Sequence, residues 1–124
     1  MKYIYNKLVR DKIPENINSE KERKANYKIL SDEEYLKELD RKLLEEAHEL
    51  IEAHNEEEIA DLMEVIFAIM KVNNISIDKV EETRKIKNSQ KGSFEKKIYL
   101  IDVEQDKIDE REEREMKKEW RKVN

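Results

Sequence analysis

Apolar side chains in the centre of the chain recur at steps of three and four residues, which is the spacing of one face of an α-helix. The pattern begins after Ser31 and Glu34, which match a capping box, in which each side chain binds the other residue's free backbone N–H. We therefore predict a long helix from Asp32 down to His54. Its apolar face is formed by Leu36, Leu39, Leu43, Ala47, Leu50 and Ile51.

A second helix is predicted directly after the first and extends to about Asn74. Asn55 and Glu58 repeat the capping pattern at its start. Apolar residues cover nearly all of its circumference, so this helix needs neighbours on several sides. We expect the two helices to form an antiparallel hairpin. The apolar residues of the second helix are Ile59, Leu62, Met63, Val65, Ile66, Phe67, Ala68, Ile69, Met70 and Val72.

Shorter elements flank this pair of helices. Asp11 is a candidate cap for a first short helix that carries Pro14 in its first turn and runs towards Lys24. Ser76 is a candidate cap for a third long helix, which ends before Gly92.

Two stretches favour an extended conformation, "NYKIL" at residues 26–30 and "KKIYLIDV" at residues 96–103. They could pair as a minor two-stranded β element. The chain has one glycine and one proline, too few turn residues for an all-β domain or a nucleotide-binding α/β fold. The predicted fold class is all-α, a helical bundle built on the helix hairpin.

The end of the chain, residues 104–124, consists almost entirely of charged residues. Glu110 with Arg114 and Glu113 with Lys117 have the four-residue spacing that supports an exposed helix. Two interpretations stay open, a solvated helical tail and a helix that binds a partner or another subunit. The side chains available for packing are Ile108, Met116, Trp120 and Val123.

Composition limits the size of the core. The 124 residues fit one small domain, and 46% of them are charged while only 37% are hydrophobic. A single copy would bury a thin core, so we expect a homo-oligomer. The formal net charge of -5 argues against a nucleic-acid-binding protein, which needs an excess of Lys and Arg on one face.

The sequence also indicates the compartment. It has no cysteine, which fits a reducing environment and excludes disulfides and thiolate metal sites. The N-terminus lacks the apolar stretch of a signal peptide, and the most apolar run, residues 62–70, is interrupted by Glu64. We expect a cytoplasmic protein that does not bind membranes.

Several carboxylates fall among the apolar positions of the two central helices. Glu46 lies within the apolar face of the first helix, and Glu49 lies on its flank. Asp61 and Glu58 lie on the side of the second helix that is predicted to be enclosed. A buried ionised carboxylate costs several kcal/mol unless a positive charge compensates it. Two pairs of acids that converge across a helix hairpin, without His or Cys, suit Mg²⁺ or Mn²⁺.

Simpler explanations exist for most of these acids. Glu-rich surface helices produce the spacing E-x-x-E by chance, and Glu58 is favoured in a first turn by its cap and the helix dipole. Asp61 is harder to explain, because Asp is a poor residue in the middle of a helix. Glu45 with His48 matches half of a di-iron motif, but this pair is predicted to face away from the apolar side.

The same acids carry a resemblance to a known family. Glu46 and Glu49, followed by Glu58 and Asp61, resemble the E-x-x-E and E-x-x-D motifs of the MazG-like all-α nucleoside triphosphate pyrophosphohydrolases. Blocks over roughly residues 3–101 look, in order, like the compact house-cleaning branch, also labelled phosphoribosyl-ATP pyrophosphohydrolase-like. These blocks are "YNKLVRDKIPE", "LSDEEYL", "KLLEEAHEL", "EEIADLMEVIFAI" and "KGSFEKKIYL". The resemblance thus assigns residues 1–103 to one domain and leaves 104–124 as a charged helical tail.

The resemblance implies Mg²⁺-dependent hydrolysis of a nucleoside triphosphate between its α- and β-phosphates, which gives a monophosphate and pyrophosphate. It implies that the four acids bind the metal, or that one of the glutamates positions the attacking water. Family members are typically dimers or tetramers with sites near subunit interfaces. Candidate residues for binding phosphate oxygens are Lys7, Arg10, Lys12, Arg84, Lys87 and Lys91.

The chain departs from the family pattern in two places. Only eight residues separate Glu49 from Glu58, fewer than in MazG itself, and "KGSF" stands where relatives often have two glycines. Two alternative functions remain open. One is the hydrolysis of phosphoribosyl-ATP, although an aromatic–His pair of that branch is replaced by "EVIFAI". The other is a noncatalytic helical interaction protein that uses its tail to bind a partner.

Overall fold

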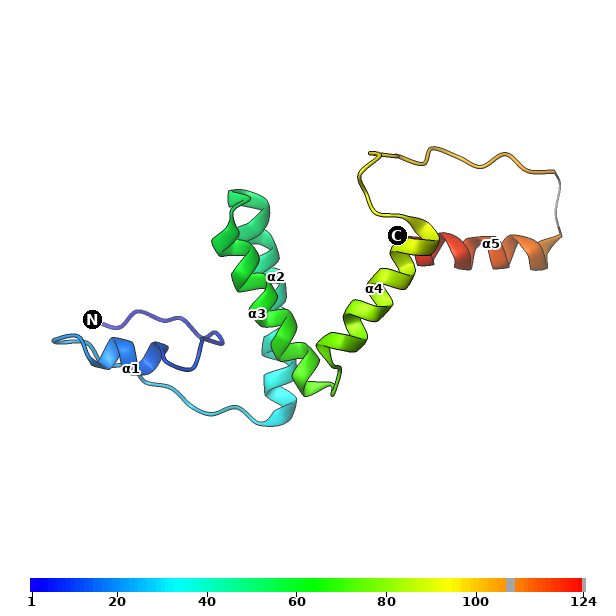
Figure 1. The fold of residues 1–124 in the computed structure, drawn as a ribbon. Coiled ribbons are helices and arrows are strands. Elements are labelled where there is room, and N and C mark those ends of the chain that lie inside the picture. Colours follow the sequence, from blue (N-terminus) through cyan, green and yellow to red (C-terminus); the bar gives the residue numbers. More distant parts are fainter. Residues whose placement is uncertain (107–108, 124) are drawn as a thin grey trace. The chain divides into compact units, whose positions relative to one another are not determined.

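The computed structural model describes residues 1–106 and 109–123, which form five α-helices and no strand (Figure 1). The chain divides into two compact units, Met1–Gln90 and Lys91–Asn124. The fold is therefore all-α, as the sequence predicts. None of the helices in the described ranges combines the length and the apolar character that crossing a membrane requires.

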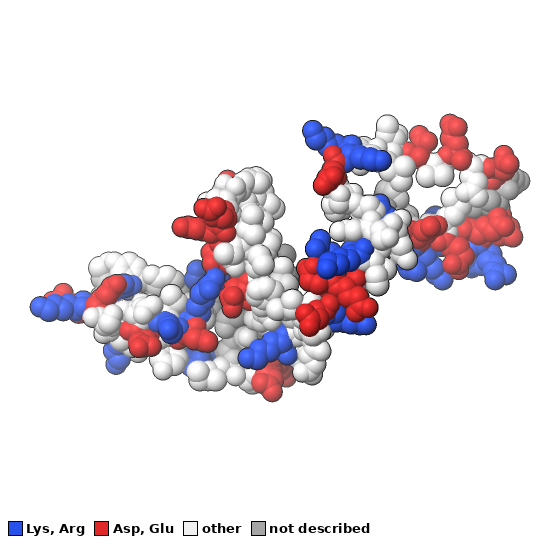
Figure 2. Space-filling model, viewed as in Figure 1, with Lys and Arg blue, Asp and Glu red and all other residues white. Residues whose placement is uncertain are grey.

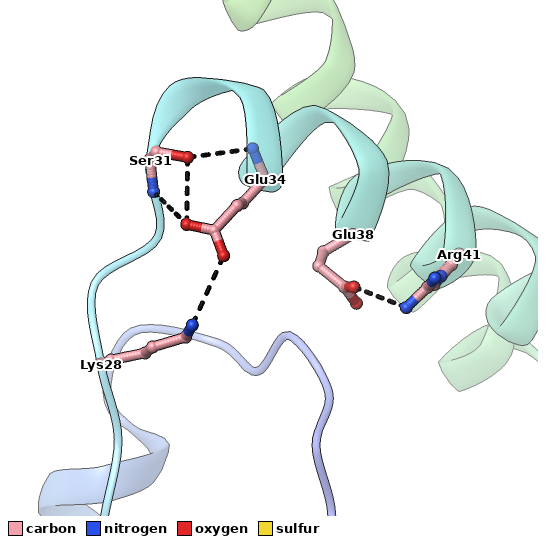
Figure 3. Close-up of polar contacts among 5 residues, drawn as sticks. All are labelled: Lys28, Ser31, Glu34, Glu38 and Arg41. Carbon is pink, nitrogen blue, oxygen red and sulfur yellow. Dashed lines mark hydrogen bonds and ion pairs between the residues drawn. The ribbon is translucent and has the colours of Figure 1, made fainter.

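The long helix α2 (Asp32–Ala53) begins at the predicted capping box. The backbone N–H of Glu34 donates to the Ser31 hydroxyl at 3.2 Å, and the Ser31 N–H donates to the Glu34 carboxylate at 3.2 Å (Figure 3). These hydrogen bonds lower the pKa of Glu34, and Lys28 adds to this effect. The cap thus fixes the first turn of α2 and the direction in which its apolar face points.

Helix α3 (Glu56–Val72) packs against α2, and the two run in opposite directions (Figure 1). The chain reverses at His54, which adopts a left-handed conformation with φ 49°, and at Asn55. The Asn55 side chain accepts a hydrogen bond from the Glu58 N–H at 3.0 Å and so caps α3. Because the connection is this short, the start of α3 lies beside the end of α2.

The apolar core of the described residues is small. Its buried side chains are Leu39 of α2 with Val65 and Met70 of α3, and Glu46 is buried with them at 9% exposure. Within the described part of the chain, α2 and α3 are the one pair of elements in extensive contact. The thin core expected from the composition is present, and it lies between these two helices.

Helix α1 (Ile13–Asn18) differs from the prediction at both ends. Its cap is Lys12, which makes no capping hydrogen bond through its side chain, so the assignment of Asp11 as cap is wrong. Pro14 does lie in the first turn. The helix ends at Asn18 instead of continuing towards Lys24, because the Asn18 side chain accepts a hydrogen bond from the Ala25 N–H at 2.8 Å and holds a turn.

Helix α4 (Ile77–Lys91) has the predicted boundaries. The Ser76 hydroxyl accepts a hydrogen bond from the Lys79 N–H at 3.1 Å, and Gly92 follows the helix with φ 82°. The apolar residues Val80 and Ile86 of α4 are exposed.

The predicted two-stranded β element is absent from the described residues. Residues 26–30 and 96–103 have no regular secondary structure, and they belong to different units of the chain. Their β-branched and aromatic residues favour an extended backbone, but a strand also needs a neighbour to accept its hydrogen bonds. Ile29, Ile98 and Ile101 are exposed accordingly.

The charged end of the chain contains α5 (Glu110–Val123). Asp109 accepts a hydrogen bond from the Glu112 N–H at 2.9 Å, and Glu113 pairs with Lys117 at 3.5 Å. Met116 is half-buried, whereas Trp120 is 49% exposed. The predicted packing residue Ile108 and the Val123 side chain lie outside the described residues.

Candidate metal centre

Three of the four predicted acids meet between α2 and α3. Glu46, Glu58 and Asp61 each place one carboxylate oxygen within 4.8 Å of the other two. Glu46 comes from the buried side of α2. Glu58 lies in the first turn of α3, and Asp61 follows one turn later on the same side. The helix pair and its Asn55 cap therefore bring the acids together.

The exposure of the acids differs from the prediction. Glu46 is buried, but Glu58 and Asp61, which we expected to be enclosed, are only half-buried. The reason is that α2 is the one element in extensive contact with α3 in the described part of the chain, so one side of the cluster stays open. A ligand can reach the carboxylates from that side.

Glu58 is the acid with the least compensation. Loss of hydration raises its pKa, and the negative charges of Glu49, Asp61, Glu46 and Glu57 raise it further. Among the described residues, no cation forms an ion pair with its carboxylate. An additional positive charge beside Glu58 would offset this repulsion.

Glu49, the fourth predicted acid, is not part of the cluster. It is exposed on α2, although it lies close enough to raise the pKa of Glu58. The spacing of three residues from Glu46 places Glu49 on the flank of the helix, as predicted. A carboxylate at such a position could contact a ligand that enters the cluster from its open side.

Lys42 provides a positive charge that sequence analysis missed. Its amino group lies 3.3 Å from a Glu46 oxygen and 3.4 Å from a Glu45 oxygen, and its side chain is only 17% exposed. The four-residue spacing of Lys42 and Glu46 on one helix was the signal that could have identified this pair. Glu45 is consequently half-buried and ion-paired, although we expected it to face away.

The N-terminal segment supplies two further cations. Arg10 donates a hydrogen bond to Asp61 at 2.7 Å, and Lys7 donates one to Glu45 at 3.2 Å. Asn6, with φ 46°, turns the backbone just before Lys7, and Asn is a residue type that tolerates this conformation. Lys7 and Arg10, two of the predicted phosphate-binding residues, therefore lie at the acids.

The other predicted phosphate-binding residues lie elsewhere. Lys12 is exposed at the start of α1. Arg84 and Lys87 lie along a different surface pocket on α4, where Arg84 pairs with Glu81 at 2.9 Å. Lys91 belongs to the second unit of the chain. Of the predicted phosphate-binding residues, Arg10 contacts the cluster, and Lys7 pairs with the neighbouring Glu45.

The donor set fits a hard divalent cation. It consists of carboxylate oxygens alone, which are the ligands that Mg²⁺ and Mn²⁺ prefer. Oxygens around one Mg²⁺ are separated by about 3 to 4 Å, given metal–oxygen distances of about 2.1 Å. The oxygens of the cluster all lie within 4.8 Å of one another, which is close to this spacing.

Comparison with known protein families, with curated proteins and with solved structures finds no match for this chain.

Proposed function

We propose that this chain is an Mg²⁺-dependent nucleoside triphosphate pyrophosphohydrolase, with Mn²⁺ as an alternative metal. It would cleave between the α- and β-phosphates and release a nucleoside monophosphate and pyrophosphate, a reaction suited to house-cleaning of the nucleotide pool. The observation that carries the proposal is the convergence of Glu46, Glu58 and Asp61 from two helices, beside the cations Lys42 and Arg10. The resemblance of the sequence to the MazG-like family points to the same chemistry.

Each residue of the site has a defined task in this reaction. Glu46, Glu58 and Asp61 would hold the metal, which would supply positive charge to neutralise the phosphates. Glu49, on the flank of α2, would add a further carboxylate oxygen or accept the proton of the attacking water. The water adds to the α- or the β-phosphorus, the bond from that phosphorus to the α,β-bridging oxygen breaks, and the other half of the substrate leaves with the bridging oxygen. Arg10 and Lys7 hold phosphate oxygens.

The proposal includes a helix hairpin that assembles into a homodimer or homotetramer. One face of α3 carries four apolar side chains at helical spacing, and all of them are exposed. Figure 2 shows uncharged surface along the middle of the helix pair. These residues are Ile59, Met63, Ile66 and Phe67. A second copy of the chain that packs against this face would complete a helical bundle.

Product analysis tests the proposed activity. Purified protein with Mg²⁺ is given standard, deoxy and damaged nucleoside triphosphates and, for comparison, phosphoribosyl-ATP. We expect release of pyrophosphate and a monophosphate from at least one triphosphate. If none of these substrates yields pyrophosphate with Mg²⁺ or Mn²⁺, the proposed function is wrong.

A matched pair of variants tests the site assignment. Asp61→Asn keeps the size of the side chain but removes the charge, and we expect turnover to fall at least about 100-fold. Glu64→Gln, an equivalent change on the exposed side of the same helix, should leave turnover within about twofold. Unchanged turnover in Asp61→Asn would show that the metal is bound elsewhere.

A further inference from the structure

The cluster contains an ion pair that competes with the proposed metal. Asp61 offers an oxygen to the cluster, and its carboxylate accepts a hydrogen bond from Arg10 at 2.7 Å. A guanidinium that donates to a carboxylate withdraws the electron density that a metal would use, and its positive charge repels a cation at the same place. Arg10 and a metal ion therefore compete for the negative charge of Asp61.

Arg10 is free to move because its environment is open. Its side chain is 56% exposed and that of Asp61 is 42% exposed. The Arg10 carbonyl accepts a hydrogen bond from the Ile13 N–H at 3.0 Å, so the backbone is held at the start of α1 and the freedom lies in the exposed side chain. The long Arg side chain can change its partner by rotation about its own bonds.

Arg10 nevertheless stays close to the cluster when it leaves Asp61. Lys7, three residues earlier, pairs with Glu45 of α2 at 3.2 Å, and Leu8 between them is half-buried. These contacts tether the N-terminal segment to the helix pair independently of Asp61. The released guanidinium therefore remains near any ligand that enters the open side.

Lys42 behaves differently from Arg10. It lies on α2, one turn from Glu46, with a side chain that is only 17% exposed and pairs with two acids. This cation is a fixed part of the site. Of the two cations that contact the cluster, Arg10 is the one that can exchange its partner.

We propose that Arg10 is an exchangeable counter-ion, which neutralises Asp61 in the metal-free protein and moves to a phosphate oxygen when metal and triphosphate bind. This inference rests on the proposed function. The planar guanidinium can donate two hydrogen bonds to a carboxylate and equally to a phosphate, so the same fork serves both partners. Arg10 is thus a substrate-binding residue with a second role in the empty site.

The exchange couples the two ligands. The first ligand to bind must break the Arg10–Asp61 pair, and the second then finds its own partner already released. Metal and triphosphate therefore raise each other's affinity by the same factor. A divalent cation alone binds more weakly than the three carboxylates would otherwise allow.

Calorimetric titration with Mn²⁺ tests this exchange without any measurement of turnover. The titration is performed with the full chain, first with Mn²⁺ alone and then with a triphosphate in which a methylene group replaces the α,β-bridging oxygen. We expect Arg10→Gln to bind Mn²⁺ alone at least threefold more tightly than the wild type. We expect the same variant to bind the triphosphate analogue at least fivefold more weakly.

Two further variants separate the exchange from general electrostatics. Lys2→Gln removes one positive charge from the same exposed segment and should leave Mn²⁺ affinity unchanged. Arg10→Lys keeps the charge but loses the planar fork, and it should restore part of the competition with Mn²⁺.

The outcomes distinguish the exchange from the metal centre itself. If the wild type binds Mn²⁺ and Arg10→Gln binds it equally or more weakly, Arg10 does not compete for Asp61 and the exchange is wrong, while the metal centre stands. If neither protein binds Mn²⁺, with or without the analogue, both the metal centre and the exchange are wrong.

Discussion

At the scale of single residues, the carboxyl group of Glu58 is expected to make the stability of the protein depend on pH. Its pKa is raised in the folded protein by lost hydration and by the acids around it. Between the ordinary glutamate pKa and this raised value, the folded state binds more protons than the unfolded state. Stability must therefore fall as the pH rises through this range.

Removing the charge of Glu58 should reverse this loss. We expect Glu58→Gln to have a higher melting temperature than the wild type at pH 7 without divalent cations, and a difference close to zero near about pH 3, where the glutamate carboxyl is protonated in both the folded and the unfolded state. Thermal unfolding followed by circular dichroism at both pH values measures this effect. A melting temperature at pH 7 that falls in the variant would contradict the electrostatic environment described for Glu58.

The sequence identifies single residues of the site only where a helical pattern makes them unusual. Glu46 and Asp61 stand out because they occupy positions among apolar neighbours. The pairing of Arg10 with Asp61, 51 residues away, has no such signal, because nothing in a helical pattern reports on a segment without regular structure. Glu49 shares the spacing of the other acids, but its place on the helix flank keeps it out of the cluster.

At the scale of elements, capping residues determine where the helices begin. The capping box at Ser31 starts α2, and we expect Ser31→Ala to lower the free energy of unfolding by about 1 kcal/mol. Lys37→Ala, an exposed change within the same helix, should alter it by less than about 0.5 kcal/mol. Urea denaturation of both variants measures the difference. Equal midpoints would mean that packing against α3, and not the cap, fixes the start of α2.

Element boundaries were predictable where a side chain satisfies a specific backbone group. Ser31, Asn55 and Ser76 each cap the helix predicted for them. Asp11 is not the cap of α1, because the helix begins at Ile13 and Lys12 occupies the capping position. The two extended stretches fail as strands because strand formation depends on a partner, which a local pattern cannot supply.

At the scale of the whole molecule, the exposed apolar face of α3 predicts self-association. Ile66→Glu places a charge in the middle of that face, and we expect it to shift the proposed dimer or tetramer to a monomer. Lys71→Glu adds the same side chain on the polar side of α3 and should leave the assembly intact. Sedimentation velocity distinguishes the two results. A wild-type protein that sediments as a monomer at all concentrations would exclude this interface.

The N-terminal segment has a consequence for how the protein should be handled. Lys7 and Arg10 connect it to α2 and α3 through ion pairs at partly exposed side chains, and such pairs are screened by dissolved salt. At high salt concentration these two ion pairs weaken and residues 1–12 would separate from α2 and α3, while the backbone hydrogen bonds inside the helices remain. Ionic strength therefore changes access to the carboxylate cluster without unfolding the α2–α3 helix pair.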